Sequence, residues 1–250
     1  MIGALLLRGL MAGLIAGVIA FGYAELVGEP SVEQAIAFEA KAAAQRGEKP
    51  EPAIVSREVQ RGWGLFTGIV VYATALGGLF SLAFGIAWGR LAWNDARLLA
   101  AALTVTALLV IAICPALKYP PNPPSVGQPD TIRLRTALYF AMLSWSLLSA
   151  VAAFMASRML RLSLGTWNAL VAGLLVFTIL AGTMAWLLPD VGEVPAAFPA
   201  MLLWRFRIAA LGLQAVLWIS LGLIFGWLVN SYFRVAEERL ILEREADFGR

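Results

Sequence analysis

Long apolar stretches, separated by shorter polar or charged ones, dominate this chain. Six stretches are apolar over about the 20 residues that a helix needs to cross a bilayer core. They cover residues 2–23, 64–88, 98–117, 136–156, 168–188 and 208–229. Only the first contains an internal charge, Arg8, and no small-residue cleavage site closes it, so we expect a retained helix rather than a signal peptide. The pattern predicts an all-α, polytopic membrane bundle of about six transmembrane helices.

The connections between these stretches are unequal, and this favours one orientation. The two short turns at 90–97 and 157–167 carry arginines, which concentrate in cytoplasmic loops. We therefore expect both termini in the cytoplasm. The three long connections, 24–61, 118–135 and 189–207, then share the opposite side. Most of the nine tryptophans lie at or just outside the ends of the apolar stretches, as in an interfacial aromatic belt.

Composition supports the membrane prediction and removes several classes of function. The 250 residues are 60% hydrophobic and only 14% charged. A soluble domain cannot bury that much apolar surface. A net charge of +3 with scattered basic residues does not predict nucleic-acid binding. Histidine is absent and Cys114 is the single cysteine, so histidine catalysis, histidine–metal ligation and an internal disulfide are excluded. We predict one bundle over residues 1–233 and a charged cytoplasmic helical tail over 234–250.

The connection at 24–61 predicts a helix of its own outside the membrane. Ser31 and Gln34 have the spacing of a capping box, and alanine-rich sequence follows, so we expect a helix over 32–46 and a linker over 48–53. Glu25, Glu29 and Glu33 recur every four residues, but Pro30 is expected to break the helix face that they would share.

Acidic side chains of the connections are candidate ligands of a hard or borderline cation. The alternative is interfacial solvation and helix capping; Asp130, for example, is placed to cap the fourth predicted helix. The metal candidates are Glu25, Glu29, Glu33, Glu39 and Asp130.

The connection KYPPNPPSVGQPDT, residues 118–131, is rich in proline and nearly free of bulky apolar side chains. Proline restricts the backbone and removes hydrogen-bond donors, so this segment predicts a stiff connector that lines a vestibule, forms a lid or receives a partner. The candidate surface residues are Lys118, Tyr119, Pro120, Asn122, Pro123 and Pro124.

Two further patterns concern packing and charge. Gly9, Gly13 and Gly17 form a glycine seam that predicts close helix packing within the chain, with a dimer seam as the alternative. Arg205 and Arg207 precede the sixth apolar stretch. They are suited either to lipid headgroups or, for one of them, to inward pairing with an acid such as Glu25 or Asp190.

Four stretches of the sequence resemble the family of predicted cobalt transporter subunits called CbtA. They are RGLMAGLIAG followed by GEPSVEQAIAFE, VSREVQRGWGLFTGIVVYATALGGLF, and KYPPNPPSVGQPDTIRLRTALY. The resemblance implies a polytopic subunit of the bacterial inner membrane that takes up Co²⁺ together with a small single-span partner. It implies no ligand set that can be transferred to this chain.

Two hypotheses follow. The first is a subunit of a cobalt or other divalent-metal uptake transporter, in contact with lipids and other integral membrane subunits. The second is an accessory or structural subunit of a larger membrane complex, since the predicted spans hold almost no charge. An enzyme is not expected, because the sequence has no nucleophile–base pair, phosphate-binding loop, dinucleotide fingerprint or haem motif. It predicts neither catalytic nor cofactor-binding residues; Co²⁺ enters only as cargo.

Overall fold

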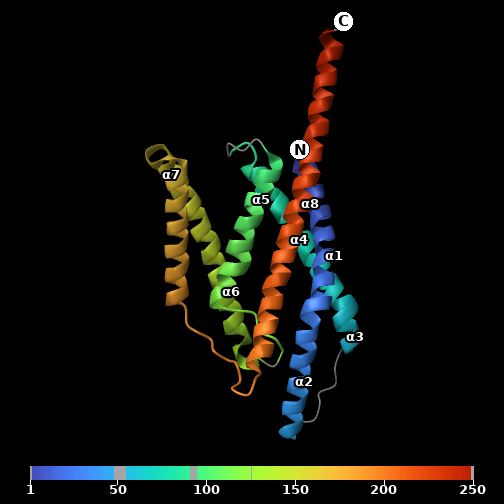
Figure 1. Cartoon of the computed structure of the whole chain (residues 1–250), viewed down its shortest axis with the longest axis vertical. Helices are drawn as coiled ribbons and strands as arrows, with labels where there is room; N and C mark the ends of the chain where they lie inside the picture. The colour runs from blue at the N-terminus through green and yellow to red at the C-terminus, as the bar shows by residue number, and fades with distance from the viewer. Residues whose placement is uncertain (1, 48–54, 91–94, 125, 249–250) are drawn as a thin grey trace. The chain divides into compact units, whose positions relative to one another are not determined.

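The computed structural model describes residues 2–47, 55–90, 95–124 and 126–248. This part of the chain is helical without any strand, which confirms the all-α fold (Figure 1). The predicted linker at 48–53 and Trp93 of the predicted aromatic belt lie outside the described residues. The α-helices are α1 Ile2–Tyr23, α2 Glu29–Gln45, α3 Arg57–Val59, α4 Leu65–Ala87, α5 Ala96–Ala107, α6 Cys114–Lys118, α7 Ile132–Leu187 and α8 Ala200–Phe248. Three π-helical segments, η1 Ala24–Gly28, η2 Gln60–Gly64 and η3 Leu108–Ile113, and the 3₁₀ turn η4 Pro129–Thr131 complete the elements.

Five continuous helices in the described chain are long and apolar enough to cross a membrane. The sequence predicts about six crossings, and the difference lies in α7, which contains both the fourth and the fifth predicted stretch. Gly165, with φ of 75° and ψ of 169°, interrupts the helical backbone of α7. The chain turns back there, and the Trp145 indole N–H donates to the Leu180 carbonyl at 2.9 Å across the two legs (Figure 1). Glycine suits this turn because it adopts a positive φ without a Cβ penalty.

The helix in the connection 24–61 is found, but it begins differently from the prediction. Instead of a new helix capped by Ser31, α1 continues through η1 into α2, and Pro30 does not end it. Proline cannot donate to the carbonyl four residues earlier and its ring crowds that carbonyl. Here that residue is Leu26, inside η1, where hydrogen bonds reach back five residues, as from the Glu29 N–H to the Ala24 carbonyl. The wider π-helical turn accommodates the proline without breaking the helix.

A second π-helical segment precedes a second proline in the same way. η3 ends two residues before Pro115, just as η1 ends two residues before Pro30. Proline leaves backbone carbonyls of the preceding turn without a donor, which is costly at membrane depth. The fully buried Ser146 of α7 supplies one, because its hydroxyl donates to the Val110 carbonyl at 2.8 Å.

The described chain forms two compact units. The first contains residues 1–29, 52–106 and 212–250, and the second contains 30–51 and 107–211. In the first unit, Gly9, Gly13 and Gly17 of α1 lie directly on α4. A Cβ on Gly9 would overlap the Gly77 carbonyl, and one on Gly13 would overlap the Ala73 carbonyl. This is the close approach that small residues allow in membranes.

Aromatic side chains join α8 to α4 within the first unit. Phe225 makes edge-on contacts with Phe80 and Phe84, at ring distances of 5.3 and 5.1 Å. The one charge inside the first predicted span, Arg8, lies 4.0 Å from the ring centre of Tyr232, a cation–π contact. The Arg8 guanidinium also donates to the Ala4 carbonyl at 2.8 Å.

Candidate functional site

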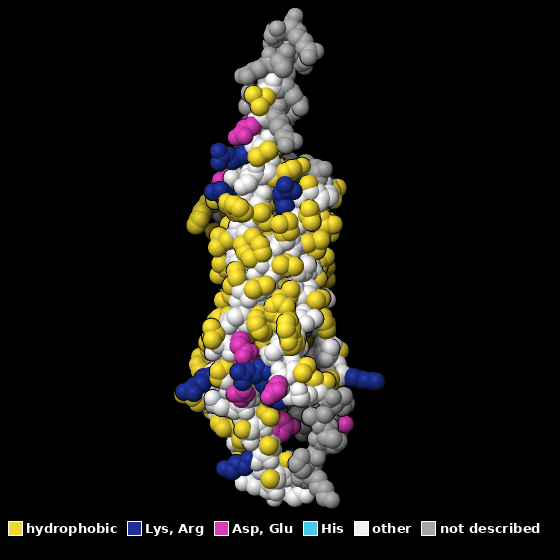
Figure 2. Space-filling model, turned by 90° about the vertical axis from the view of Figure 1, so that its right-hand side faces the viewer, with side chains coloured by type: hydrophobic (Ala, Val, Ile, Leu, Met, Phe, Trp, Pro, Cys, Tyr) yellow, Lys and Arg dark blue, Asp and Glu magenta, His cyan; other side chains and the backbone are white. Residues whose placement is uncertain are grey.

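The two acids nearest the end of α1 are both paired with arginines of the same unit. Glu25 Oε1 accepts from Arg61 Nε at 3.0 Å, and Glu29 pairs with Arg57. The two acids are four residues apart, about one helical turn, and so are the two arginines. The two ion pairs therefore connect antiparallel segments one turn apart, and we call them the ion-pair ladder. The expectation that Pro30 would separate the carboxylates was wrong for Glu25 and Glu29, because the helix continues through η1. Figure 2 shows charged side chains gathered next to a broad apolar surface.

One carboxylate oxygen in this ladder has no partner. Glu25 Oε2 is buried and accepts no hydrogen bond, and Arg57 Nε is likewise buried without an acceptor. A buried carboxylate oxygen without a donor raises the free energy of the folded state. Glu25 is therefore the residue of the ladder at which an additional cation or donor would be stabilising.

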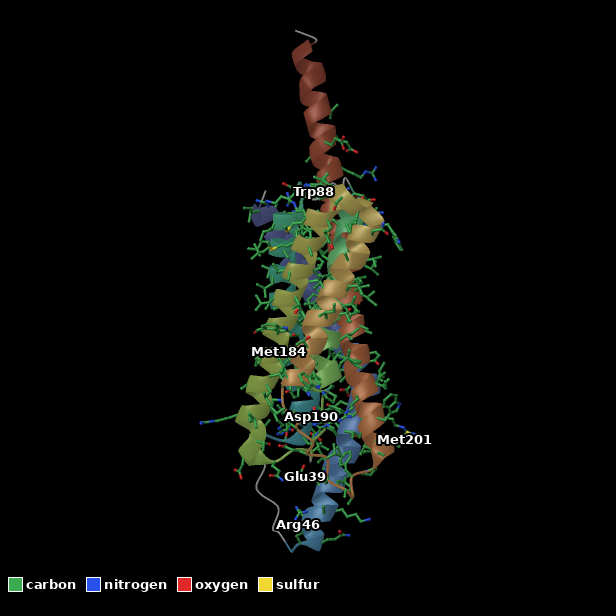
Figure 3. The ribbon with its side chains drawn as sticks, turned by 90° about the vertical axis from the view of Figure 1, so that its left-hand side faces the viewer. Glu39, Arg46, Trp88, Met184, Asp190 and Met201 are labelled. Carbon is green, nitrogen blue, oxygen red and sulfur yellow. The ribbon has the colours of Figure 1, made fainter. Side chains whose placement is uncertain are left out.

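Lys118 and Tyr119, at the start of the proline-rich connection, are bound to the segment that follows α7. Lys118, whose side chain is only 12% exposed, forms an ion pair with Asp190. The Tyr119 hydroxyl donates to the Pro189 carbonyl at 2.8 Å. Burial raises the pKa of the Tyr119 hydroxyl above its ordinary value, which further favours the protonated form that donates this hydrogen bond. Figure 3 labels Met184 in the last turn of α7 and Asp190 just beyond the end of this helix.

The far end of the connection is held by Glu193. Its Oε2 accepts from the Gln128 backbone N–H at 2.9 Å and lies 3.4 Å from Arg135 Nε. The Thr131 hydroxyl and the Gln128 N–H, with the Arg135 charge, hold the pKa of Glu193 below its ordinary value. The Arg135 guanidinium lies over Gly127, whose φ of 114° and missing Cβ both suit a glycine.

The middle of the connection is held by α8. Arg207 Nη2 donates to Asn122 Oδ1 at 2.8 Å, while Arg205 is exposed. Of the two alternatives for these arginines, pairing with an acid such as Glu25 or Asp190 is not found, because the described side-chain partner of Arg207 is the neutral Asn122. A headgroup role stays a prediction. Asp130 does not cap the fourth helix. It lies in η4, and α7 begins after Thr131 without a side-chain cap.

The helix α2 closes this assembly with an apolar contact outside the predicted spans. Ala35 packs in one buried cluster with Val126 of the proline-rich connection and with Phe198 and Leu202 before and within α8. Phe38 adds an edge-on contact to Phe198 at 5.1 Å between ring centres. We call the assembly of α2, residues 118–131 and residues 188–199 the loop cap.

The loop cap explains the composition of the proline-rich connection. Three cations at helix ends, Lys118, Arg135 and Arg207, hold its start, end and middle. Pro123 is buried, Pro120 is half-buried and Pro124 is exposed. A backbone that is already restricted loses less conformational entropy when it is fixed at three points. The candidate surface therefore makes internal contacts through Lys118, Tyr119 and Asn122.

The predicted metal candidates do not converge in the described chain. Glu25 and Glu29 are paired with arginines, whereas Glu33, Glu39 and Asp130 are exposed. Among the residues that the structure describes, no three histidine, cysteine or acidic side chains lie close enough to hold a metal ion. A metal role for these acids stays a prediction.

Sequence reasoning missed several residues that hold these arrangements together. Arg57, Arg61, Arg135, Glu193 and Phe198 were not singled out, although each has a defined contact. One signal was available, since the spacing of Arg57 and Arg61 matches that of Glu25 and Glu29. The others depend on contacts between distant segments.

Comparison with known proteins supports the resemblance of the loops. No curated protein and no solved structure matches the chain. One family model, described as probable cobalt transporter subunit (CbtA), matches residues 2–230. This match includes all five long apolar helices except the end of the last one. The chain is therefore a member of the CbtA family of probable cobalt transporter subunits.

Proposed function

We propose that this protein is an integral subunit of a cobalt or related divalent-metal uptake transporter in the bacterial cytoplasmic membrane, with both termini inside. The family match over residues 2–230 is the observation that carries this proposal. The resemblance adds a small single-span partner subunit. Catalysis forms no part of the proposed role.

The chemistry of the chain favours a shared metal path. Imidazole nitrogen is a preferred ligand of first-row transition metals, and this chain has no histidine. Oxygen ligands alone select poorly among divalent ions. We propose that nitrogen ligands come from the partner subunit, while this chain supplies the membrane path and acidic side chains.

Within this proposal, Glu25 is the entry carboxylate. Its Oε1 is held by Arg61 and its Oε2 is buried without a partner, so an arriving cation would satisfy an existing deficit. Replacing Glu25 by Gln keeps the shape and removes the charge. We expect Co²⁺ uptake to fall with Glu25→Gln and to remain with Glu39→Gln, a matched change at an exposed acid on α2.

The decisive experiment measures Co²⁺ accumulation in cells without their own cobalt uptake system. The cells express this chain with its partner, each alone, or neither. We expect accumulation above background only when both are present. Accumulation that is unchanged when this chain is omitted would contradict the proposal.

That outcome would favour the second candidate, an accessory subunit without transport activity of its own. The observation behind this candidate is that, within the described residues, no three histidine, cysteine or acidic side chains lie close enough to hold a metal ion. It predicts stoichiometric co-purification with other integral proteins while metal accumulation does not depend on the chain.

A further inference from the structure

One of the three cations that hold the loop cap lacks an anionic partner. Lys118 pairs with Asp190 and Arg135 with Glu193. Arg207 instead has the neutral Asn122 as its hydrogen-bond partner, and it forms no ion pair with any carboxylate of the described chain. The structure thus leaves one of the three cations that hold the loop cap without a counter-charge.

The Arg207 guanidinium is partly removed from water, although it has no counter-charge in the described chain. Arg207 is half-buried, and its Nε is fully buried without an acceptor. A guanidinium group carries five N–H donors, and here a single one has a described protein acceptor. Removing a charge from water is costly unless a counter-charge and hydrogen bonds replace the lost hydration. An anion from outside the chain would supply both.

The surroundings of Arg207 indicate where that anion comes from. Trp204, one helical turn earlier, is 62% exposed, and Met201 and Ile208 are exposed apolar side chains of the same helix. Figure 3 labels Met201 near the start of α8. Exposed tryptophan beside arginine at the end of an apolar helix is typical of the headgroup level of a bilayer. An acyl chain can lie along the apolar side chains while the headgroup reaches the guanidinium.

We propose that Arg207, positioned by Asn122, binds a phosphate group. Guanidinium donors match phosphate oxygens in a planar, two-pronged geometry. The Asn122 oxygen holds one side of the guanidinium and so orients the remaining donors. The chemistry is shared by a phospholipid headgroup and by free phosphate. The site is independent of cobalt transport and would exist whether or not the chain carries an ion.

The test uses the full chain, extracted and delipidated in a phosphate-free maltoside detergent. Unfolding is followed by tryptophan fluorescence during heating. The probes are dioleoyl phosphatidylglycerol, its phosphate-free counterpart dioleoylglycerol, and sodium phosphate against sodium chloride of equal ionic strength. We expect phosphatidylglycerol, but not dioleoylglycerol, to raise the apparent Tm by about 3 °C or more.

Variants identify the residue that responds. Arg205→Gln removes an exposed arginine of the same helix end and should keep the full shift, whereas Arg207→Gln should lose it. Asn122→Asp places a carboxylate against Arg207 from within the chain. This variant should stay folded without phosphate and lose the response.

Each outcome decides between alternatives. A shift with sodium phosphate alone would identify free phosphate as the ligand. No shift in the wild type from either phosphate source would overturn the proposal, as would an Arg207→Gln variant that responds like the wild type. If Arg207→Gln does not fold, an undiminished response of Asn122→Asp overturns it.

Discussion

Gly68 and Gly77 both lie on α4, yet an added side chain would meet very different surroundings at the two positions. A Cβ at Gly77 would overlap the Gly9 carbonyl and lie 2.8 Å from the Gly13 Cα, whereas nothing described lies within 4 Å of one at Gly68. Backbone on the opposite helix cannot move aside as a flexible side chain can. Residue identity is therefore restricted by the neighbouring helix rather than by helix propensity.

We expect Gly77→Ala to lower the free energy of unfolding by about 1–3 kcal/mol through overpacking. Gly68→Ala, on the same helix, should leave the free energy of unfolding unchanged or raise it by up to about 1 kcal/mol, because alanine has the higher helix propensity. Thermal unfolding of both variants in one detergent checks this. Equal stability of the two variants would contradict the contact between α1 and α4.

Glu193 gives a prediction about pH. Its pKa is lowered in the folded state, so its ionised form stabilises the loop cap. That contribution is complete above the unfolded value of about 4.3 and disappears as the pH falls through the lower folded value. We expect Glu193→Gln to be less stable than the wild type at pH 7, with the difference in Tm shrinking as the pH falls below about 4.3. A difference that stays constant over this range would argue against the Gln128 and Thr131 hydrogen bonds.

At the scale of elements, π-helical segments let two prolines remain inside long helices. η1 precedes Pro30 and η3 precedes Pro115 by the same spacing. Around η3, Ser146 completes the hydrogen bonding of the widened turn from a different helix. The serine and the proline should therefore depend on each other energetically.

We expect Ser146→Ala to cost about 1 kcal/mol, a typical value for a hydrogen bond between helices in a membrane. The cost should shrink when Pro115 is replaced by Ala, because a backbone N–H then becomes available to the preceding turn. A double-mutant cycle measures this coupling. Ser149→Ala serves as control, since its hydroxyl bonds to the Trp145 carbonyl within its own helix.

The helix α2 yields a further prediction at this scale. Its buried contact depends on Phe198, which is 5% exposed. Phe198→Ala should remove about 3–5 kcal/mol of packing free energy and release α2 and residues 126–128. Hydrogen exchange in these segments should accelerate, and it should not with Gln34→Ala, a change at an exposed position of α2. Protected α2 amides in Phe198→Ala would contradict the loop cap.

At the scale of the whole molecule, the reversal at Gly165 decides whether the number of crossings is even. If both legs of α7 cross, Leu162 near the turn and Ala197 before α8 lie on opposite sides of the membrane. We expect Leu162→Cys to react with an impermeant thiol reagent from the side of the termini and Ala197→Cys from the other. Both side chains are exposed, and replacing the buried Cys114 by Ser removes the background. Reaction of both from one side would exclude six crossings.

The length of the apolar stretches alone determined that this protein is an all-α membrane protein, and it determined where the long helices lie. Hydrophobicity is a property of each residue, and a bilayer sets the length over which it must persist, so both can be read along the chain. The sequence motifs of the loops were likewise sufficient to recognise the resemblance to the CbtA family. Continuity through Pro30 was not predictable, because it depends on a π-helical turn that no local propensity indicates.

Tertiary structure alone decided which charges pair and what the proline-rich connection contacts. With 19 basic and 16 acidic residues, composition permits many pairings. The observed ones join positions far apart in sequence, such as Glu25 and Arg61 or Lys118 and Asp190, which are 36 and 72 residues apart. Electrostatic attraction and hydrogen bonding act over a few ångströms between side chains, and only the packing of the helices brings such distant residues within that range.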